Sequence, residues 1–268
     1  PALSSALEEA GVKIIRNSTV KSVVIENNVF TSVELKDESL QCSDVIFATP
    51  HHITARILES SVTKSKIPVL EEMGSKIEKL CNNIGRIEYR SLIGIHSFYR
   101  GNRIPKDFTF AVMVDQPLIQ MVFNRNSELS SPIEEGIQWV TVPVSAADEY
   151  LKMEDEEILQ QLDKVLLQLW PENAGIERIE HLIVRTPKAT FAPTPGSAEL
   201  RPTASFLGNN IAIAGCWTKT NWPSTMEGAV RSGLNAAAHI LDIEWDSEKP
   251  WQQWPLRPQR GDAKWPIW

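Results

Sequence analysis

The residues best suited to chemistry are concentrated between positions 211 and 233. An apolar strand is expected to end at Gly215, where the missing Cβ would let a ligand lie against the backbone. A helix is predicted over 225–241, and Ser224 or Thr225 is expected to cap its first turn. The unbonded N–H groups of such a turn present about half a positive charge, which suits a phosphate or the anionic edge of a reduced flavin. The pattern predicts a cofactor-binding turn, although packing of a helix on a sheet uses the same small residues.

Two further features of this segment support more than one interpretation. Gly228 and Ala229 in the first turns of the predicted helix, with Gly233 one turn later, would let a partner pack very close. Glu227 has the chemistry of a general base, yet an acid in the first turn is also favoured by the helix dipole alone. We prefer the structural interpretation for Glu227 and assign no catalytic residue from the sequence.

The segment closely resembles the C-terminal flavin-binding signature of the FAD-dependent amine oxidase superfamily, in which an apolar strand and a Gly-acid pair precede Met-Glu-Gly-Ala and Ser-Gly. Gly215, the run 226–229, Ser232 and Gly233 match this signature. The resemblance implies FAD as the cofactor. It implies a cofactor-binding set made of Gly215, Cys216, Trp217, Thr225, Met226, Glu227, Gly228 and Ala229.

The chain departs from the superfamily pattern in two places. Cys216 stands where the family usually carries an acid, and a thiol is a weak hydrogen-bonding substitute for a carboxylate. No Gly-x-Gly-x-x-Gly occurs in the 268 residues, so the dinucleotide-binding turn is not part of this chain. The resemblance therefore implies a C-terminal portion whose missing N-terminal segment belongs to the same polypeptide.

Within the superfamily, the details are most similar to the squalene-associated desaturases. The runs 188–196 and 217–233 resemble the versions found in that group, and Thr225 occupies a position where amine oxidases usually place an aromatic residue. The resemblance implies a long isoprenoid as substrate, with reductive dehydroxylation of hydroxysqualene to squalene for hopanoid or sterol precursor synthesis. Trp222 and Phe191 are candidates for lining an apolar substrate channel, with core packing as the equal alternative.

Three other functions remain open at this point. A phytoene or carotene desaturase would use the same cofactor with the opposite direction of hydride flow, and an amine oxidase-like flavoenzyme is a more distant candidate. A non-catalytic isoprenoid-binding scaffold would explain Cys216 and the absent dinucleotide turn as loss of the cofactor.

The elements that position this segment indicate an α/β fold, with part of a doubly wound, Rossmann-like FAD-binding domain and an inserted mixed α+β substrate domain. A helix over 1–10 that ends at Gly11 is expected to lead into strands at 12–15, 20–25 and 29–35, and a buried strand is expected within 42–50. Later runs suggest a mixed sheet and a helix over 155–169. The predicted parts are 1–55 and 205–243 for the FAD-binding domain, 56–204 for the substrate domain and 244–268 for a tail rich in Trp and Pro.

Composition excludes several classes of protein. The net charge of −7 would repel nucleic acid, and no apolar run is long enough to span a membrane. No metal site is predicted, because neither the three cysteines nor the pair His51-His52 has ligand spacing, and a loop role is expected for the pair. We expect a cytoplasmic protein or one peripheral on the inner face of a membrane. The tail is predicted to pack along its own domain, with an interfacial membrane anchor as the alternative.

Overall fold

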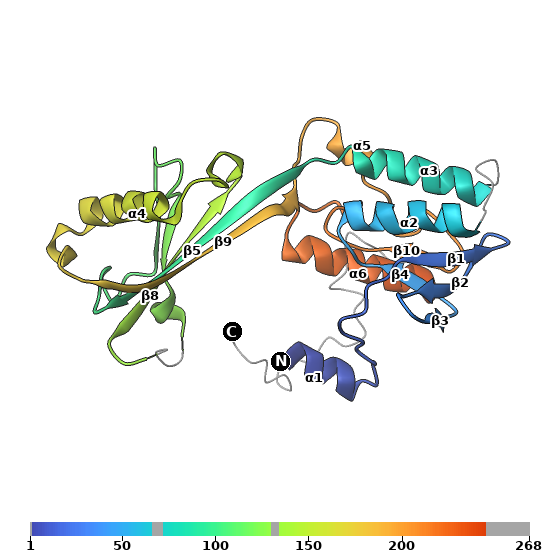
Figure 1. Cartoon of the computed structure of the whole chain (residues 1–268), viewed down its shortest axis with the longest axis horizontal. Coiled ribbons are helices and arrows are strands. Elements are labelled where there is room, and N and C mark those ends of the chain that lie inside the picture. Colours follow the sequence, from blue (N-terminus) through green and yellow to red (C-terminus); the bar gives the residue numbers. More distant parts are fainter. Residues whose placement is uncertain (1, 66–71, 130–133, 245–268) are drawn as a thin grey trace. The chain divides into compact units, whose positions relative to one another are not determined.

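The computed structural model describes residues 2–65, 72–129 and 134–244, which form two compact units (Figure 1). The first unit comprises the described residues up to 87 and those from 193 onward, and the second comprises the described residues of 88–192. These limits differ from the predicted domain boundaries at 55/56 and 204/205. The segments 56–87 and 193–204 belong to the first unit, because the helices after residue 50 pack against its strands.

The first unit contains most of the helices. Its elements are α1 (Ala2–Glu9), β1 (Ser22–Glu26), β2 (Val29–Glu34), β3 (Ser39–Gln41), β4 (Val45–Phe47), α2 (His51–Ser65), α3 (Glu72–Gly85), α5 (Ser197–Leu200), β10 (Ile211–Ile213) and α6 (Met226–Ile240).

The start of the chain follows the predicted order with one exception. Helix α1 ends before Gly11, which has a φ of +82° in the left-handed region where glycine carries no steric penalty. The strand predicted over 12–15 is wrong: that segment is irregular and largely exposed, so it has no partner strand to stabilise an extended ladder. The predicted strands 20–25 and 29–35 are present as β1 and β2, and β3, which was not predicted, pairs with β2 to complete an antiparallel meander. Both Asn27 and Asn28 have positive φ, as a tight hairpin turn requires.

The two short parallel strands carry the nucleotide-binding pattern. Strand β10 pairs with β4 in the register Ala212 to Ile46, and β10 is buried at every position because α6 packs against it. The prediction that the strand within 42–50 is buried on both faces is wrong for β4, since Ile46 is 42% exposed. Strand β4 has one described partner strand, so its other edge is unpaired among the described residues.

Helix α2 begins directly at the histidine pair, so the expected loop role for His51-His52 is wrong. The carbonyl of Pro50 accepts hydrogen bonds from the amides of Ile53 and Thr54, which starts the helix immediately after β4. Further along α2, the hydroxyl of Ser61 accepts a hydrogen bond of 2.8 Å from the amide of Val23 in β1. This contact fixes the helix to the meander.

The second unit is a sheet with one helix. Its elements are β5 (Tyr89–Arg100), β6 (Phe110–Val112), β7 (Met121–Asn124), η1 (Arg125–Glu128), β8 (Ile137–Ser145), η2 (Asp148–Tyr150), α4 (Asp155–Leu169), η3 (Pro171–Asn173) and β9 (Arg178–Phe191). The sheet order is β6-β7-β8-β5-β9, and every pair is antiparallel, so the predicted mixed sheet is wrong. Helix α4 has the predicted limits, and it is the described helix that packs on this sheet.

The two faces of this sheet differ in their covering. One face packs against α4 in a core that includes Ile93, Ile95, Val142, Leu162 and Leu166. Along each strand, the residues of this core alternate with residues that point to the opposite face and are half-buried to exposed. Cross-strand pairing places on this second face, hereafter the open face, Leu92, Gly94, His96, Phe98, Phe110, Val112, Met121, Phe123, Trp139, Thr141, Pro143, Leu182 and Val184.

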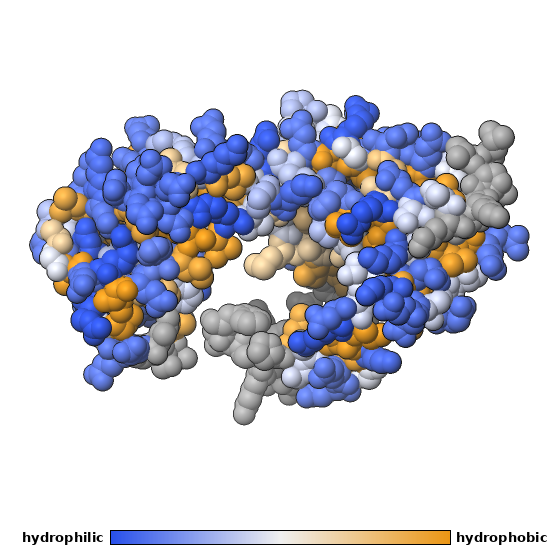
Figure 2. Space-filling view, in the orientation of Figure 1, coloured by the Kyte–Doolittle hydropathy of each residue, from blue (hydrophilic) through white to orange (hydrophobic). Residues whose placement is uncertain are grey.

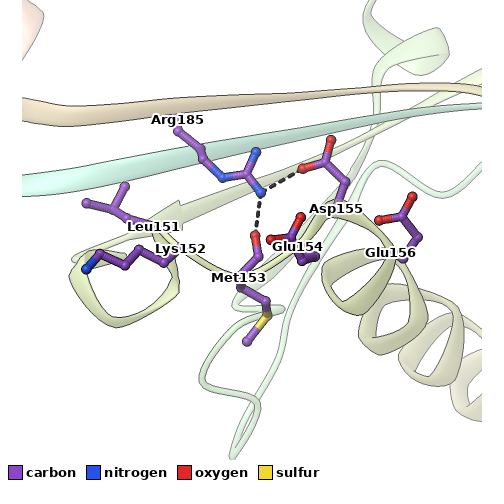
Figure 3. Close-up of a pocket in the computed structure, with 7 residues that line it drawn as sticks. All are labelled: Leu151, Lys152, Met153, Glu154, Asp155, Glu156 and Arg185. Carbon is purple, nitrogen blue, oxygen red and sulfur yellow. Dashed lines mark hydrogen bonds and ion pairs between the residues drawn. The ribbon is translucent and has the colours of Figure 1, made fainter.

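Arg185 anchors the start of α4 to β9 (Figure 3). Its Nη2 atom donates to a carboxylate oxygen of Asp155 and to the carbonyl of Met153, each at 2.6 Å. The hollow beside it is lined by residues 151–156 together with Arg185. The guanidinium that lines this hollow is already bonded to Asp155 and to the carbonyl of Met153. We therefore assign Arg185 a structural role.

The predicted Trp- and Pro-rich tail lies outside the described residues, apart from its first position. Within the part of the chain that the structure describes, no helix has both the length and the apolarity to cross a bilayer.

Candidate functional site

Gly215 lies at the end of β10, where the sequence predicts a cofactor-binding turn. Its φ is +141°, and a Cβ built on it would lie 2.4 Å from the indole Nε1 of Trp217. Its amide donates a 2.7 Å hydrogen bond to the hydroxyl of Ser232 in α6. The absence of a Cβ is therefore explained by packing within the chain, and contact of Gly215 with a cofactor stays a prediction.

Trp217 joins the turn to the segment between β4 and α2. Its side chain is buried at 4% exposure, and its indole Nε1 donates a 3.1 Å hydrogen bond to the carbonyl of Thr49. The indole ring centroid lies 6.0 Å from that of His51, in an edge-to-face arrangement. The indole thus joins the turn after β10 to the residues after β4, two segments that are far apart in the sequence.

Arg201 holds the loop that follows the turn. Its Nε donates to the carbonyl of Thr218 at 2.9 Å, and its Nη2 donates to the carbonyls of Cys216 and Trp222, each at 3.1 Å. The hydroxyl of Thr220 also lies 3.2 Å from Nη2. One side chain can bond several acceptors of this loop, because a guanidinium offers several donors in a fixed fork.

The first turn of α6 has the predicted cap. Thr225 has extended backbone angles, and its hydroxyl accepts a 3.2 Å hydrogen bond from the amide of Gly228. Among the described residues no acceptor bonds the amides of Met226 and Glu227, and the Met226 side chain is 88% exposed. A Cβ on Gly228 would lie 2.5 Å from the carbonyl oxygen of Pro223, so this glycine brings loop and helix close together.

We expect Thr225→Val to lower the free energy of unfolding by about 1 kcal/mol, because the hydroxyl that accepts from the amide of Gly228 is lost. Thr225→Ser keeps an oxygen at the same place and should retain most of the stability. Urea unfolding of the three proteins measures the difference. Equal midpoints for Val and Ser would show that the cap contributes nothing.

Glu227, Arg231 and Trp222 form one cluster on the outside of this turn. A carboxylate oxygen of Glu227 accepts from Nε of Arg231 at 2.8 Å, and the guanidinium carbon lies 4.0 Å from the Trp222 ring centroid. The cation is buried between its two partners, while Trp222 is 40% exposed. The ion pair supports the structural interpretation of Glu227.

Cys216 points toward the start of α6. Its sulfur lies 3.3 Å from the hydroxyl of Ser224, and its Cβ lies 3.7 Å from the position that a Cβ on Gly228 would take. A thiol there offers a weak donor and a weak acceptor where a carboxylate would offer strong acceptors. A cofactor at this position would therefore have to be recognised mainly by the backbone.

The structure brings together the sequence-predicted cofactor residues, because all of them lie in the first unit between the end of β10 and the second turn of α6. Phe191 belongs to the second unit, whereas the cofactor residues belong to the first. It ends β9 in the second unit, is buried, and pairs in register with Tyr89, as core packing predicts. Among the described residues, no group of His, Cys, Asp and Glu side chains is arranged to hold a metal ion.

Sequence reasoning missed the open face of the second unit. Phe98 stacks on Trp139 with ring centroids 5.9 Å apart, and Phe110 stacks on Phe123 at 5.6 Å. Phe110, Val112, Leu182 and Val184 are exposed, and Figure 2 shows hydrophobic residues at the surface of this unit. The alternation of Leu92, His96 and Phe98 along one strand was the available signal.

Comparison with known proteins identifies the family. The family described as "Flavin containing amine oxidoreductase" matches residues 2–241. The chain belongs to this family. These are FAD-dependent oxidoreductases, so the membership implies FAD as the cofactor, and the α/β fold with a flavin-binding region follows from it.

The amine oxidoreductase family contains relatives with different named activities. The chain is similar to a zeta-carotene desaturase of Capsicum annuum, with 32% identity over 106 residues that cover 40% of this chain and 18% of the relative. It is also similar to a hydroxysqualene dehydroxylase of Rhodopseudomonas palustris, with 30% identity over 159 residues that cover 58% of this chain and 33% of the relative. The chain thus spans a minor part of the curated relatives it matches.

The fold is shared with solved structures at low identity. A protein of Exiguobacterium sp. 255-15, assigned as a protoporphyrinogen oxidase, superimposes with a TM-score of 0.64 at 14% identity. The match covers 90% of this chain and 51% of that one. At this identity the likeness shows the amine oxidase fold and no more.

The residues at the start of α6 fit a flavin. Two amides without described acceptors, the positive end of a helix and an exposed Met226 side chain offer donors and an apolar contact at one place. The electron-rich carbonyl edge of an isoalloxazine ring matches such donors. Met226, Glu227 and Thr225 are therefore the residues that would hold it.

Proposed function

We propose that the protein containing this chain is an FAD-dependent oxidoreductase that acts on a long isoprenoid, and that it reduces hydroxysqualene to squalene. The observation that carries the apolar substrate class is the open face. Its aromatic and aliphatic side chains come from all five strands, while the charged residues Arg100 and Glu180 lie at one end of it and Arg125 lies over the Trp139 ring. Several exposed apolar side chains gathered on one face are typical of a binding surface.

The relatives support the same class. The two curated relatives are named for hydroxysqualene and for zeta-carotene, which are both long isoprenoids. The relative named for hydroxysqualene is 30% identical to this chain over 159 residues. Thr225 at the cap position, in place of an aromatic residue, favours an isoprenoid over an amine.

The residues of the chain would act by binding, orienting and excluding water. The open face would bind the hydrocarbon chain, because each Å² of apolar surface removed from water contributes about 25 cal/mol. The first turn of α6 would hold the flavin through the amides of Met226 and Glu227. FAD, when bound, supplies the hydride-transfer chemistry.

We also propose that another segment of the same polypeptide completes the FAD-binding domain. The dinucleotide-binding turn is not in this sequence, and β4 presents an edge without a described partner strand. A further parallel strand could pair there, next to the exposed Ile46. Because long isoprenoids partition into bilayers, peripheral contact with a membrane is part of this proposal.

Carotene desaturation is the second candidate. The similarity to the zeta-carotene desaturase of Capsicum annuum favours it, and the open face suits a carotene as well as hydroxysqualene. The two reactions differ in the direction of hydride flow, so product analysis separates them.

The test begins with the longest natural reading frame that contains this sequence. We expect the purified protein to show the absorbance of bound oxidised flavin and, with FAD and a reductant, to convert hydroxysqualene to squalene. Conversion of phytoene or zeta-carotene instead would establish the desaturase. A protein that binds no flavin even after FAD is added would be the non-catalytic isoprenoid-binding scaffold.

A further inference from the structure

One polar ring lies within the apolar surface of the open face. His96 is in the middle of β5, between Gly94 and Phe98, and its cross-strand neighbours on the same face are Thr141 in β8 and Leu182 in β9. The side chain is half-buried. Buried polar atoms are usually hydrogen-bonded, so each of the two ring nitrogens needs a partner or contact with solvent.

The first nitrogen is fixed as a hydrogen-bond acceptor. The indole Nε1 of Trp139 lies 3.2 Å from Nδ1 of His96, and an indole N–H can only donate. Nδ1 must therefore carry its lone pair toward the indole, and the hydroxyl of Thr141 lies 3.2 Å from the same atom. In the neutral imidazole the hydrogen must then be on Nε2.

The surroundings keep this ring neutral. Burial lowers the pKa of His96 below its ordinary value, and the positive charge of Arg125 lowers it further. The Arg125 guanidinium lies over the Trp139 ring, with 5.4 Å between its carbon and the ring centroid. A lowered pKa favours the neutral form of the ring over the imidazolium at neutral pH.

The second nitrogen lies beside Gly94. A Cβ built on Gly94 would lie 3.4 Å from Nε2, so the missing side chain leaves that side of the nitrogen open. Among the described residues no acceptor bonds Nε2. The open face thus presents an oriented N–H donor next to apolar side chains that include Phe98 and Leu182. An acceptor oxygen on an apolar ligand would satisfy it.

We propose that Nε2–H of His96 donates a hydrogen bond to the hydroxyl oxygen of an isoprenoid alcohol and so makes His96 a specificity-determining residue. The proposal rests on the proposed function and deepens it, because a carotene or squalene has no oxygen to accept this bond. A neutral imidazole N–H is a very weak acid, so the role is to bind and orient the hydroxyl rather than to protonate it.

The test uses the full-length protein loaded with FAD and a pair of ligands that differ in one hydroxyl, hydroxysqualene and squalene. We expect His96→Phe to weaken equilibrium binding of hydroxysqualene about tenfold, the value of one hydrogen bond, and to leave squalene binding unchanged. His96→Gln should recover most of the loss, because an amide N–H can reach nearly the same position. In turnover, His96→Phe should raise KM with little change in kcat.

A matched control is Leu167→Ala, which removes an exposed apolar side chain from the outside of α4 and should change neither affinity. Equal weakening of both ligands by His96→Phe, or no weakening of either, would overturn the proposal. The two proposals can fail separately. If the wild-type protein converts hydroxysqualene but His96→Phe binds it as tightly, the role of His96 is refuted and the proposed reaction stands. If the wild-type protein does not convert hydroxysqualene but His96→Phe loses the preference for the hydroxylated ligand, the proposed reaction is refuted and the role of His96 stands.

Discussion

Gly215→Ala is expected to lower the free energy of unfolding by about 3 to 5 kcal/mol. The new methyl group would meet the indole of Trp217 at 2.4 Å, and the φ of +141° is one that residues with a Cβ rarely adopt. Overpacking and backbone strain each cost about 1 to 3 kcal/mol. Relief of the clash would require the indole to leave the carbonyl of Thr49, so we expect weaker flavin retention as well.

Gly233→Ala is the matched control. Gly233 lies in the same segment, within α6, and a Cβ on it would meet no atom within 4 Å. Alanine in a helix interior is more stable than glycine by about 0.5 to 1 kcal/mol, so this variant should unfold at a slightly higher urea concentration. If both alanine variants unfolded at the same urea concentration, the close packing of Trp217 on Gly215 would be disproved.

Arg201→Met is expected to cost about 2 to 4 kcal/mol of stability and to loosen the loop between β10 and α6. The guanidinium bonds three loop carbonyls at once, and hydrogen bonds to a charged group contribute about 1.5 to 3 kcal/mol each before the loop readjusts. Urea unfolding measures the loss of stability. Limited proteolysis within 216–222 should become faster.

Arg201→Lys separates charge from geometry. A lysine keeps the positive charge but has a single ammonium group, which cannot bond the separated carbonyls of Thr218, Cys216 and Trp222 together. We expect it to restore less than half of the lost stability. Full recovery in the lysine variant would mean that the charge alone matters.

Local patterns in the sequence were sufficient for the elements whose stability is local. The cap at Thr225 depends on a hydroxyl three residues before an amide, and the limits of α4 depend on helical periodicity that ends at Trp170-Pro171. The turn at Asn27-Asn28 depends on residues that tolerate positive φ. The family signature between 211 and 233 was also readable, because its spacing is continuous in the chain.

Other predictions were wrong where a partner distant in sequence decides the outcome. The run 12–15 has strand-forming residues but no neighbouring strand, and His51-His52 begins a helix because Pro50 and the meander support one there. The role of Arg201 likewise depends on loop carbonyls that only the fold brings to its guanidinium. The limits of the two units depend on how α2 and α3 pack, which periodicity within each segment does not reveal.

The sequence by itself determined the family, the cofactor that this family implies, the cap of α6 and the small residues around it, because each of these is specified over a few consecutive positions. Only the tertiary structure decided why Gly215 lacks a Cβ, how Arg201 is used, and that His96 meets Trp139 within an apolar surface. The physical reason is strand register. His96 and Trp139 are 43 positions apart, and only the antiparallel pairing of β5 with β8 brings the indole N–H to the imidazole.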